Sequence, residues 1–314
     1  MRMRELGRSG IEVPPVVFGG NVFGWTVDET ASFRLLDALL DSGLNAIDTA
    51  DVYSSWVPGH AGGESETIIG AWMKARGNRA RLTIATKVGM AMGEEKGLSA
   101  SWIARAVDSS LRRLQTDYID LYQAHIDDAT VPLEETLGAF ARLIEAGKVR
   151  AIGCSNFTPQ RLQEALGVSS RLGLPRFESI QPQYNLIHRR EFEEELAGLC
   201  RREHIGAISF FALAAGFLTG KYRDAASLEG SSRQARVASF MTERNLAILD
   251  TLIAVARDEN TTPGAVAIAW LISRPALTAP IVSATSLGQL EEIRHATALT
   301  LSDASLEILD AASA

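Results

Sequence analysis

Side chains capable of acid–base chemistry stand at the ends of successive short apolar segments. Asp48 ends one such segment and is soon followed by Tyr53, Lys87 ends the next, and His125 follows the one after that. A phenol has an ordinary pKa near ~10 and is a proton donor at neutral pH. A neighbouring ammonium favours the phenolate, so we expect Lys87 to lower the pKa of Tyr53. Asp48 can act as the counter-ion of Lys87, and His125 can donate a hydrogen bond to a substrate oxygen.

This set of residues predicts polarisation and protonation of a carbonyl group. None of the four is a nucleophile paired with a base, so hydrolysis through a covalent intermediate is not indicated. The set also lacks a reductant, and carbonyl reduction would need a cofactor that carries hydride. A polar residue is common at the end of a strand, and a single histidine there is often structural. A run of such residues that includes a lysine directly after an apolar segment favours a catalytic site.

The elements that would position these residues alternate between short apolar segments and helical stretches. The apolar segments are Val16–Phe18, Leu44–Asp48, Leu82–Thr86, Tyr118–Ala124, Val149–Gly153, Phe177–Gln181, Ile205–Phe210 and Thr278–Val282. Between them, amphipathic helices are predicted at Thr30–Ser42, Glu64–Arg76, Ser99–Leu114, Leu133–Ala146 and Thr158–Arg171. Such alternation predicts an α/β fold with a parallel sheet. Eight strands favour a closed (β/α)8 TIM barrel over an open doubly wound sheet, with the chemistry at the C-terminal ends of the strands.

Two further segments lie outside this alternation. Met3–Leu6 and Ile11–Val13 flank a glycine-containing turn and predict an N-terminal β-hairpin that closes the bottom of the barrel. Tyr222–Thr242 is long for a connection in a compact domain, which indicates a functional lid or a mobile segment. Because no linker interrupts the pattern, we expect residues 1–314 to form a single domain.

Composition narrows the class of protein. The 31 Lys and Arg against 38 Asp and Glu give a formal net charge of -7, which disfavours nucleic acids and anionic membranes as partners. Only Cys154 and Cys200 occur, and no spacing suits a metal, so we expect neither a disulfide framework nor a metal site. No apolar run approaches the ~18 residues of a membrane span. The N-terminus lacks the apolar stretch of a signal peptide, so a cytoplasmic protein is expected.

Three longer motifs carry a resemblance to a known family. They are Gly43–Ala50 with Tyr53, Gly147–Phe157 and Phe217–Tyr222. With Lys87 and His125 they resemble the aldo-keto reductase family, and the similarity runs from the hairpin almost to the C-terminus. The resemblance implies reduction of a small aldehyde or ketone with NADPH. In that reaction Tyr53 would be the proton donor, Lys87 and Asp48 would tune it, and His125 would orient the substrate.

The same resemblance implies a set of cofactor contacts. They are Ser155, Asn156, Gln181, Phe210, Leu213, Gly216, Lys221, Ser283, Thr285, Ser286 and Gln289. Of these, Ser155, Asn156 and Gln181 would bind the nicotinamide carboxamide. Phe210 would stack on the ring, where the family usually has tyrosine, and Lys221 would lie along the pyrophosphate.

The segment expected at the adenosine end departs from the family pattern. Thr285 stands where relatives often carry Arg or Lys, and Ile293 stands where they carry Asn. A basic side chain there would pair with the 2′-phosphate of NADPH, so its absence predicts only a modest preference over NADH. Ser286 is placed to cap the last helix beside an anion, and Arg294 is a second candidate for the missing charge.

Substrate contacts are expected from loops over the mouth of the barrel. Trp25 and Trp56 would make the pocket apolar and tolerant of aromatic groups. Two alternatives to a reductase remain. One is a cofactor-binding regulatory subunit resembling potassium-channel β subunits, which also retain the catalytic residues. The other is a phosphate-handling barrel isomerase, for which Gly216 and Gly220 are the only hint of a phosphate loop and no catalytic Glu ends a strand.

Overall fold

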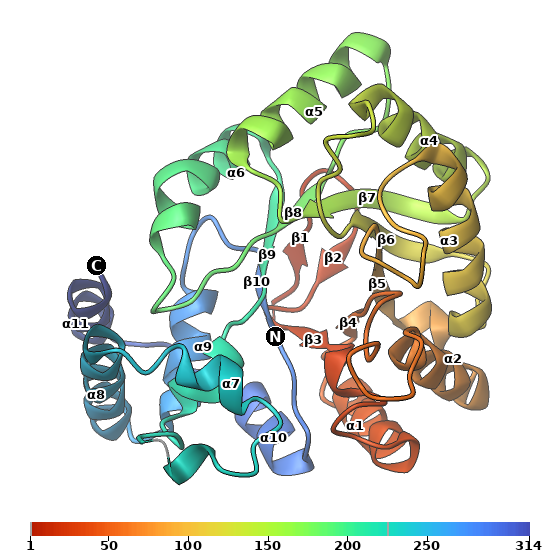
Figure 1. Cartoon of the computed structure of the whole chain (residues 1–314). Coiled ribbons are helices and arrows are strands. Elements are labelled where there is room, and N and C mark those ends of the chain that lie inside the picture. The colour runs from red at the N-terminus through yellow and green to blue at the C-terminus, as the bar shows by residue number, and fades with distance from the viewer. Residues whose placement is uncertain (1, 225) are drawn as a thin grey trace.

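Eight parallel strands close into a barrel in the computed structural model, which describes residues 2–224 and 226–314 (Figure 1). The strands are β3 (Val17–Gly19), β4 (Ala46–Asp48), β5 (Thr83–Val88), β6 (Ile119–Ala124), β7 (Val149–Ser155), β8 (Ser179–Gln181), β9 (Gly206–Ser209) and β10 (Ala279–Val282). They neighbour one another in sequence order, and β10 pairs with β3 to close the ring. The predicted (β/α)8 TIM barrel is confirmed, with strand boundaries displaced by one or two residues.

Helices surround the barrel on its outer side (Figure 1). They are α1 (Glu29–Asp41), α2 (Glu64–Arg76), α3 (Ala100–Leu114), α4 (Leu133–Glu145), α5 (Pro159–Leu172), α6 (Ala197–Glu203), α7 (Gln234–Ala238), α8 (Glu243–Asp258), α9 (Pro263–Ile272), α10 (Leu287–Ala296) and α11 (Asp303–Ser313). Local sequence explains where they begin. The side chains of Ser99 and Thr158 accept hydrogen bonds from the first turns of α3 and α5, and Pro159 occupies the first position of α5, where no N–H is needed.

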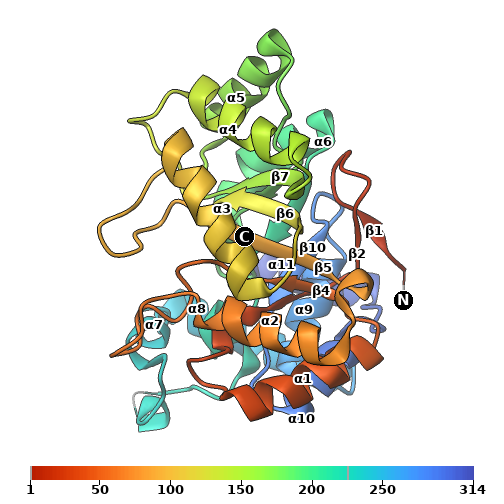
Figure 2. The same ribbon diagram turned by 90° about the vertical axis from the view of Figure 1, so that its right-hand side faces the viewer.

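The N-terminal hairpin consists of β1 (Arg4–Glu5) and β2 (Glu12–Val13), which pair antiparallel. Its apolar side chains, Leu6, Ile11 and Val13, join a small core inside the barrel. The strands contribute short side chains to that core, such as Ala46, Ala85 and Ala151, and these leave room for the hairpin. The hairpin therefore closes the bottom of the barrel as predicted, and Figure 2 shows it at the end opposite α7.

The long segment after β9 is structured around buried side chains. It contains a 3-10 turn, η5 (Ala226–Leu228), and α7, which are anchored by Leu228, Val237 and Phe240. One expectation is corrected here. Ser286 caps α10, which is not the last helix, because α11 follows it.

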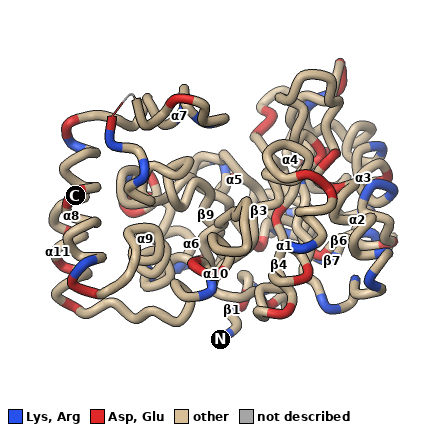
Figure 3. The backbone as a smooth tube through the Cα atoms, turned by 90° about the horizontal axis from the view of Figure 1, so that it is seen from below, with Lys and Arg blue, Asp and Glu red and all other residues tan. Residues whose placement is uncertain are grey.

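Charged residues of both signs are interspersed along the chain (Figure 3). Among the described residues, no helix combines the length and the apolar character needed to cross a membrane. The described part of the chain likewise holds no group of three or more His, Cys, Asp or Glu arranged to bind a metal ion.

Candidate active site

Asp48, Lys87 and Tyr53 form one hydrogen-bonded cluster at the C-terminal ends of β4 and β5. The Lys87 ammonium donates to Asp48 Oδ2 at 2.6 Å, to Tyr53 Oη at 2.8 Å and to the carbonyl oxygen of Thr49 at 2.8 Å. Tyr53 Oη in turn donates to Asp48 Oδ2 at 3.3 Å. All three protons of the ammonium are therefore used, and the lysine is fully buried. The side chain of Tyr53 is only partly buried, so the phenol lies between this charged pair and the mouth of the barrel.

The environment of Tyr53 shifts the pKa of its phenol in the direction opposite to the one predicted from the sequence. Desolvation, followed by the negative charge of Asp48, raises the pKa of the Tyr53 phenol well above its usual value near 10. The prediction of a lowered Tyr53 pKa is therefore wrong for the resting site, where burial and the neighbouring carboxylate raise it. Burial also lowers the pKa of Lys87, while Asp48 acts in the opposite direction. The resting phenol keeps its proton, as a proton donor must.

His125 faces the phenol from the end of β6. The two ring centroids lie 6.0 Å apart in an edge-on arrangement. Burial, and then the positive charge of Lys87, lower the pKa of His125 well below its usual value, so the imidazole is neutral. Its Nδ1 has no hydrogen-bond partner among the described residues. A neutral imidazole carries one N–H, which can be donated to an oxygen placed beside Tyr53.

The loop that carries Tyr53 is fixed by buried hydroxyl groups. Ser54 has a left-handed backbone (φ 74°), which is unfavourable for a serine, and its Oγ donates to the carbonyl oxygen of Phe23 at 2.9 Å. Thr49 Oγ1 and Ser65 Oγ lie 2.8 Å apart and share a hydrogen bond. These contacts hold a strained turn in one conformation, as is common at functional sites.

A second group of ionisable residues lies behind this loop and was not predicted from the sequence. Glu66 is fully buried and accepts from Thr86 Oγ1 at 2.5 Å and from Arg113 Nε at 2.6 Å. Asp51 is 1% exposed, and neither of its carboxyl oxygens has a partner among the described residues. Burial, followed by the charge of Glu66, raises the pKa of Asp51 to about 7. Asp51 therefore holds its proton through the mildly acidic range.

Asp51→Asn is expected to stabilise the protein at alkaline pH. The folded state binds this proton more tightly than the unfolded state, so stability falls between about pH 4 and about pH 7 and stays lost above. One pKa unit corresponds to about 1.4 kcal/mol, so the gain in the free energy of unfolding should be on the order of 2–4 kcal/mol. Urea unfolding at about pH 5 and about pH 8.5 measures most of this change in stability. The exposed Asp258→Asn is the control, and an equal effect of both variants would contradict the assignment.

The residues expected at the nicotinamide end lie next to the catalytic cluster. Ser155 ends β7 and its Oγ donates to the carbonyl oxygen of Gln181 at 2.9 Å. Asn156 Nδ2 donates to the carbonyl oxygen of His125 at 2.9 Å. Gln181 Nε2 donates to Asp48 Oδ1 at 2.9 Å. The structure therefore brings these amide and hydroxyl groups together and joins one of them to the cluster itself.

The segment after β9 has an unusual backbone. Phe211, Ala214 and Ala215 all have positive φ values, of 55°, 47° and 57°, a backbone conformation that residues other than glycine rarely adopt. Gly216 follows with φ 98°. Phe210 packs edge-on against Phe211, with ring centroids 5.2 Å apart. Backbone strain of this kind is common at functional sites.

Arg233, in the long segment, lies beside Trp25, one of the predicted substrate contacts, and was not among the residues predicted from the sequence. Its guanidinium lies over the ring of Trp25, 5.4 Å from the centroid. Burial lowers its pKa, and no carboxylate among the described residues pairs with it. Lys221 lies at the start of the same segment, over the ring of Tyr222. The length of the segment was the only signal in the sequence, and it predicted a functional lid or a mobile segment rather than this residue.

The loop after β10 is built from hydroxyl and amide contacts. Ser283 Oγ donates to Asn21 Oδ1 at 2.7 Å, and the Thr285 N–H donates to Gln289 Oε1 at 2.8 Å. Ser286 Oγ accepts from the Gln289 N–H at 3.3 Å and caps α10. Arg294 donates through Nε to Glu291 Oε2 at 2.8 Å, and a second contact completes the pair. The charge of Arg294 is therefore already opposed by a neighbouring carboxylate.

Aromatic side chains line the mouth beside the phenol. Trp56 packs edge-on against Trp25 at 5.5 Å and against Tyr53 at 6.0 Å between ring centroids. Trp56 remains 47% exposed, unlike most large apolar side chains of the barrel. The two tryptophans predicted to contact substrate thus form one wall next to Tyr53.

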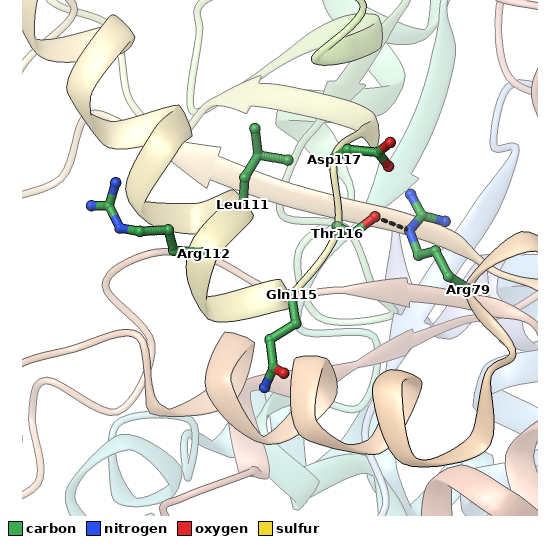
Figure 4. A pocket seen from close by; sticks show the side chains of 6 residues that line it. All are labelled: Arg79, Leu111, Arg112, Gln115, Thr116 and Asp117. Atoms are coloured by element: carbon green, nitrogen blue, oxygen red, sulfur yellow. Dashed lines mark hydrogen bonds between the residues drawn. The ribbon is translucent and has the colours of Figure 1, made fainter.

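A surface pocket of about 590 Å³ lies at the other end of the barrel (Figure 4). Its lining includes Arg79 and Gln115–Asp117, which precede β5 and β6. The guanidinium of Arg79 is occupied there by Asp120, at 2.7 Å, and by the carbonyl oxygen of Tyr118. Because the catalytic cluster follows the opposite ends of these strands, this pocket is not part of the candidate active site.

Comparison with known proteins agrees with the geometry. A profile described as "Aldo/keto reductase family" matches residues 15–314. "Aldo-keto reductase YhdN" of Bacillus subtilis is 32% identical, over 96% of this chain and 90% of that protein. "Uncharacterized oxidoreductase YrpG" of the same organism is 32% identical, over 99% and 95%. A "Probable voltage-gated potassium channel subunit beta" of Arabidopsis thaliana is 33% identical, over 93% and 90%. The chain belongs to the aldo/keto reductase family and is an NAD(P)H-dependent oxidoreductase.

Proposed function

We propose that the protein reduces a small aldehyde or ketone with NADPH and that Tyr53 protonates the carbonyl oxygen. The observation that carries this proposal is the contact of Lys87 with Tyr53 Oη at 2.8 Å. As the proton leaves Tyr53, negative charge develops on Oη, and the fixed ammonium stabilises it without moving. Asp48 holds the ammonium in place from the other side. Neutral His125 donates a hydrogen bond to the same carbonyl oxygen and sets its position.

The residues around the mouth fit a nicotinamide dinucleotide. When bound, this cofactor supplies the hydride that the side chains lack. Ser155, Asn156 and Gln181 would hold the carboxamide, and Phe210 would pack against the ring. Arg233, which pairs with no carboxylate among the described residues, and the strained backbone up to Gly216 suit a pyrophosphate. We assign Leu213 and Lys221 to the same pyrophosphate-binding part of the site.

The mouth favours substrates with an apolar or aromatic group on the carbonyl carbon. Trp25 and Trp56 offer ring faces and edges near Tyr53, and Trp56 is exposed enough to contact a ligand. A panel of aldehydes and ketones, each assayed with NADPH and with NADH by the loss of nicotinamide absorbance, tests the proposal. Turnover of aromatic aldehydes above aliphatic ones supports it. Absence of turnover with every carbonyl compound would reject it.

Thr285→Arg is expected to raise the preference for NADPH over NADH. The loop at Ser283–Ser286 offers hydroxyl groups but no unpaired cation, since Arg294 is paired with Glu291. An ionic contact to a phosphate is roughly twice as strong as a neutral hydrogen bond. One such contact is worth on the order of 1–2 kcal/mol, or about tenfold in the ratio of kcat/KM for the two cofactors.

The control for this substitution is Thr300→Arg, at an exposed position beyond the other end of α10. Arg294→Ala should change the ratio little, because the Arg294 charge is already opposed. A wild type that is strictly dependent on NADPH, with a ratio that Thr285→Arg leaves unchanged, would contradict this assignment and direct attention to Arg294.

The likeness to potassium-channel β subunits supports a second candidate, a regulatory subunit that binds the cofactor and turns over slowly. The two candidate functions differ in the expected rate of NADPH oxidation and in whether the chain associates with a membrane protein. A regulatory subunit would oxidise bound NADPH slowly and purify together with a membrane protein. Rapid multiple turnover by the isolated chain favours the reductase.

A further inference from the structure

Gln123, on β6, is a fully buried residue of the barrel interior that the mechanism above does not use. It pairs in register with Lys87 on β5 and with Gly153 on β7, so Lys87 and Gln123 belong to one layer of the barrel. A side chain at Gly153 would not fit. Its Cβ would approach Ser179 Oγ to 2.2 Å and Gln123 Cγ to 3.3 Å. The glycine therefore preserves the space in which Gln123 reaches across the barrel.

Within this space Gln123 contacts the carboxylate of the catalytic cluster. Its Nε2 donates to Asp48 Oδ1 at 3.2 Å, and Gln181 Nε2 donates to the same oxygen at 2.9 Å. Gln181 Nε2 also lies 3.4 Å from Gln123 Oε1, which accepts from it. A carboxylate only accepts hydrogen bonds, so both amides must turn their NH₂ groups toward Asp48. The two oxygens of Asp48 are thus divided, with Oδ1 bound by two amides and Oδ2 by Lys87 and Tyr53.

This division has a consequence for the proton on Tyr53. Hydrogen bonds to Oδ1 spread the carboxylate charge, which weakens the pull of Oδ2 on the Tyr53 hydrogen. They also fix the plane of the carboxylate, and that plane sets the position of Lys87. Without the amides, Asp48 would hold the phenolic proton more tightly, and only the contacts of Oδ2 would fix the plane of its carboxylate. We propose that Gln123 is a positioning residue that orients the Asp48 carboxylate so that Tyr53 can release its proton to the carbonyl oxygen.

This inference rests on the proposed role of Tyr53, and its test must separate the two. Gln123→Met keeps the length of the side chain and removes the donor, and Gln123→Glu keeps the shape and adds a second carboxyl group beside Asp48. The matched control is Gln160→Met, at an exposed position of α5. The readout is the pH dependence of alcohol oxidation with NADP⁺, in which the Tyr53 phenolate accepts the proton. The other ionisable groups that face the phenol are Asp48, Asp51, Lys87 and His125, and they are unchanged in all three variants.

Gln123→Met should displace the rising limb of the oxidation profile, which reports deprotonation of Tyr53, upward by as much as about one pH unit, because loss of one hydrogen bond to a charged group is worth about that much at the group itself. At a fixed neutral pH, oxidation should slow by as much as about tenfold, while the Kd for NADPH, from fluorescence titration, changes by less than about twofold. Near neutral pH, Gln123→Glu should reduce the carbonyl compound more slowly than Gln123→Met does. Its rate of reduction should recover as the pH falls and the new carboxyl group is protonated. Gln160→Met should match the wild type.

A Gln123→Met profile that coincides with the wild-type limb would overturn the inference, even if the rate fell with the folded fraction, because a purely structural role does not move the limb. If Gln123→Met does not fold, Gln123→Glu becomes the test. A loss of activity in that variant that acidic pH does not reverse would overturn the inference. Tyr53→Phe tests separately whether the proposed role of Tyr53 is wrong. If that variant keeps its turnover, the proposed role of Tyr53 is wrong, and if it is inactive while the Gln123→Met limb is unmoved, only the inference about Gln123 is wrong.

Discussion

Tyr53→Phe should abolish carbonyl reduction and leave the affinity for NADPH nearly unchanged. The phenylalanine ring can keep the edge-on packing against Trp56 and His125, so the substitution removes little besides the hydroxyl group. General acid catalysis contributes about 100-fold to about 10,000-fold, and turnover should fall by at least the smaller factor. The measurement is turnover of a reactive aromatic aldehyde, beside fluorescence titration with NADPH.

The control for this variant is Tyr118→Phe, at the opposite end of the barrel, where the ring lies under the guanidinium of Arg79 at 3.8 Å. It should retain wild-type turnover. If Tyr53→Phe also retains most of its turnover, Tyr53 is not the proton donor.

Lys87→Met should impair both catalysis and folding. It removes the ammonium that donates to Tyr53 Oη, so the developing phenolate loses its stabilising charge. It also leaves Asp48, 2% exposed, without its cation, and breaking a buried ion pair costs about 3–5 kcal/mol. The pH–rate profile and urea unfolding, measured together, separate the two effects.

Lys148→Met is the matched control, because Lys148 pairs with Asp108 in a partly exposed position. Such a pair is worth at most about 1 kcal/mol, and the control should be close to the wild type in both measurements. A folded Lys87→Met protein whose pH–rate profile matches the wild type would show that Lys87 and Tyr53 are not coupled.

The barrel could be predicted because its local patterns agree with its topology. Apolar segments alternate with amphipathic stretches, and caps such as Ser99 and Thr158 stand where helices begin. The convergence of Asp48, Lys87 and His125 could also be predicted, since parallel strands bring their C-terminal ends to one side of the barrel. That residues 1–314 form a single domain, and that nucleic acids are not partners, stay predictions.

Properties that depend on burial could not be predicted from local patterns. The predicted direction of the shift in the Tyr53 pKa was wrong, because spacing shows that Lys87 is near but not that burial and Asp48 raise this pKa. Asp51 reads as an ordinary polar residue after a strand, and only the packing of Glu66 and Arg113 places it in a buried cluster. Gln123 stands inside an apolar strand, and its contact with Asp48 depends on the closure of the barrel.

Transfer of deuterium from the cofactor to the product tests the central claim most directly. Wild-type protein would be incubated with an aromatic aldehyde and NADPH carrying deuterium at C4 of the nicotinamide, and the alcohol analysed by mass spectrometry and NMR. A carbonyl reductase with one fixed site should place the label on the carbinol carbon, from one of the two C4 positions only, and Tyr53→Phe should form almost none of this product. Oxidation of NADPH without labelled alcohol, or equal transfer from both C4 positions, would contradict the account.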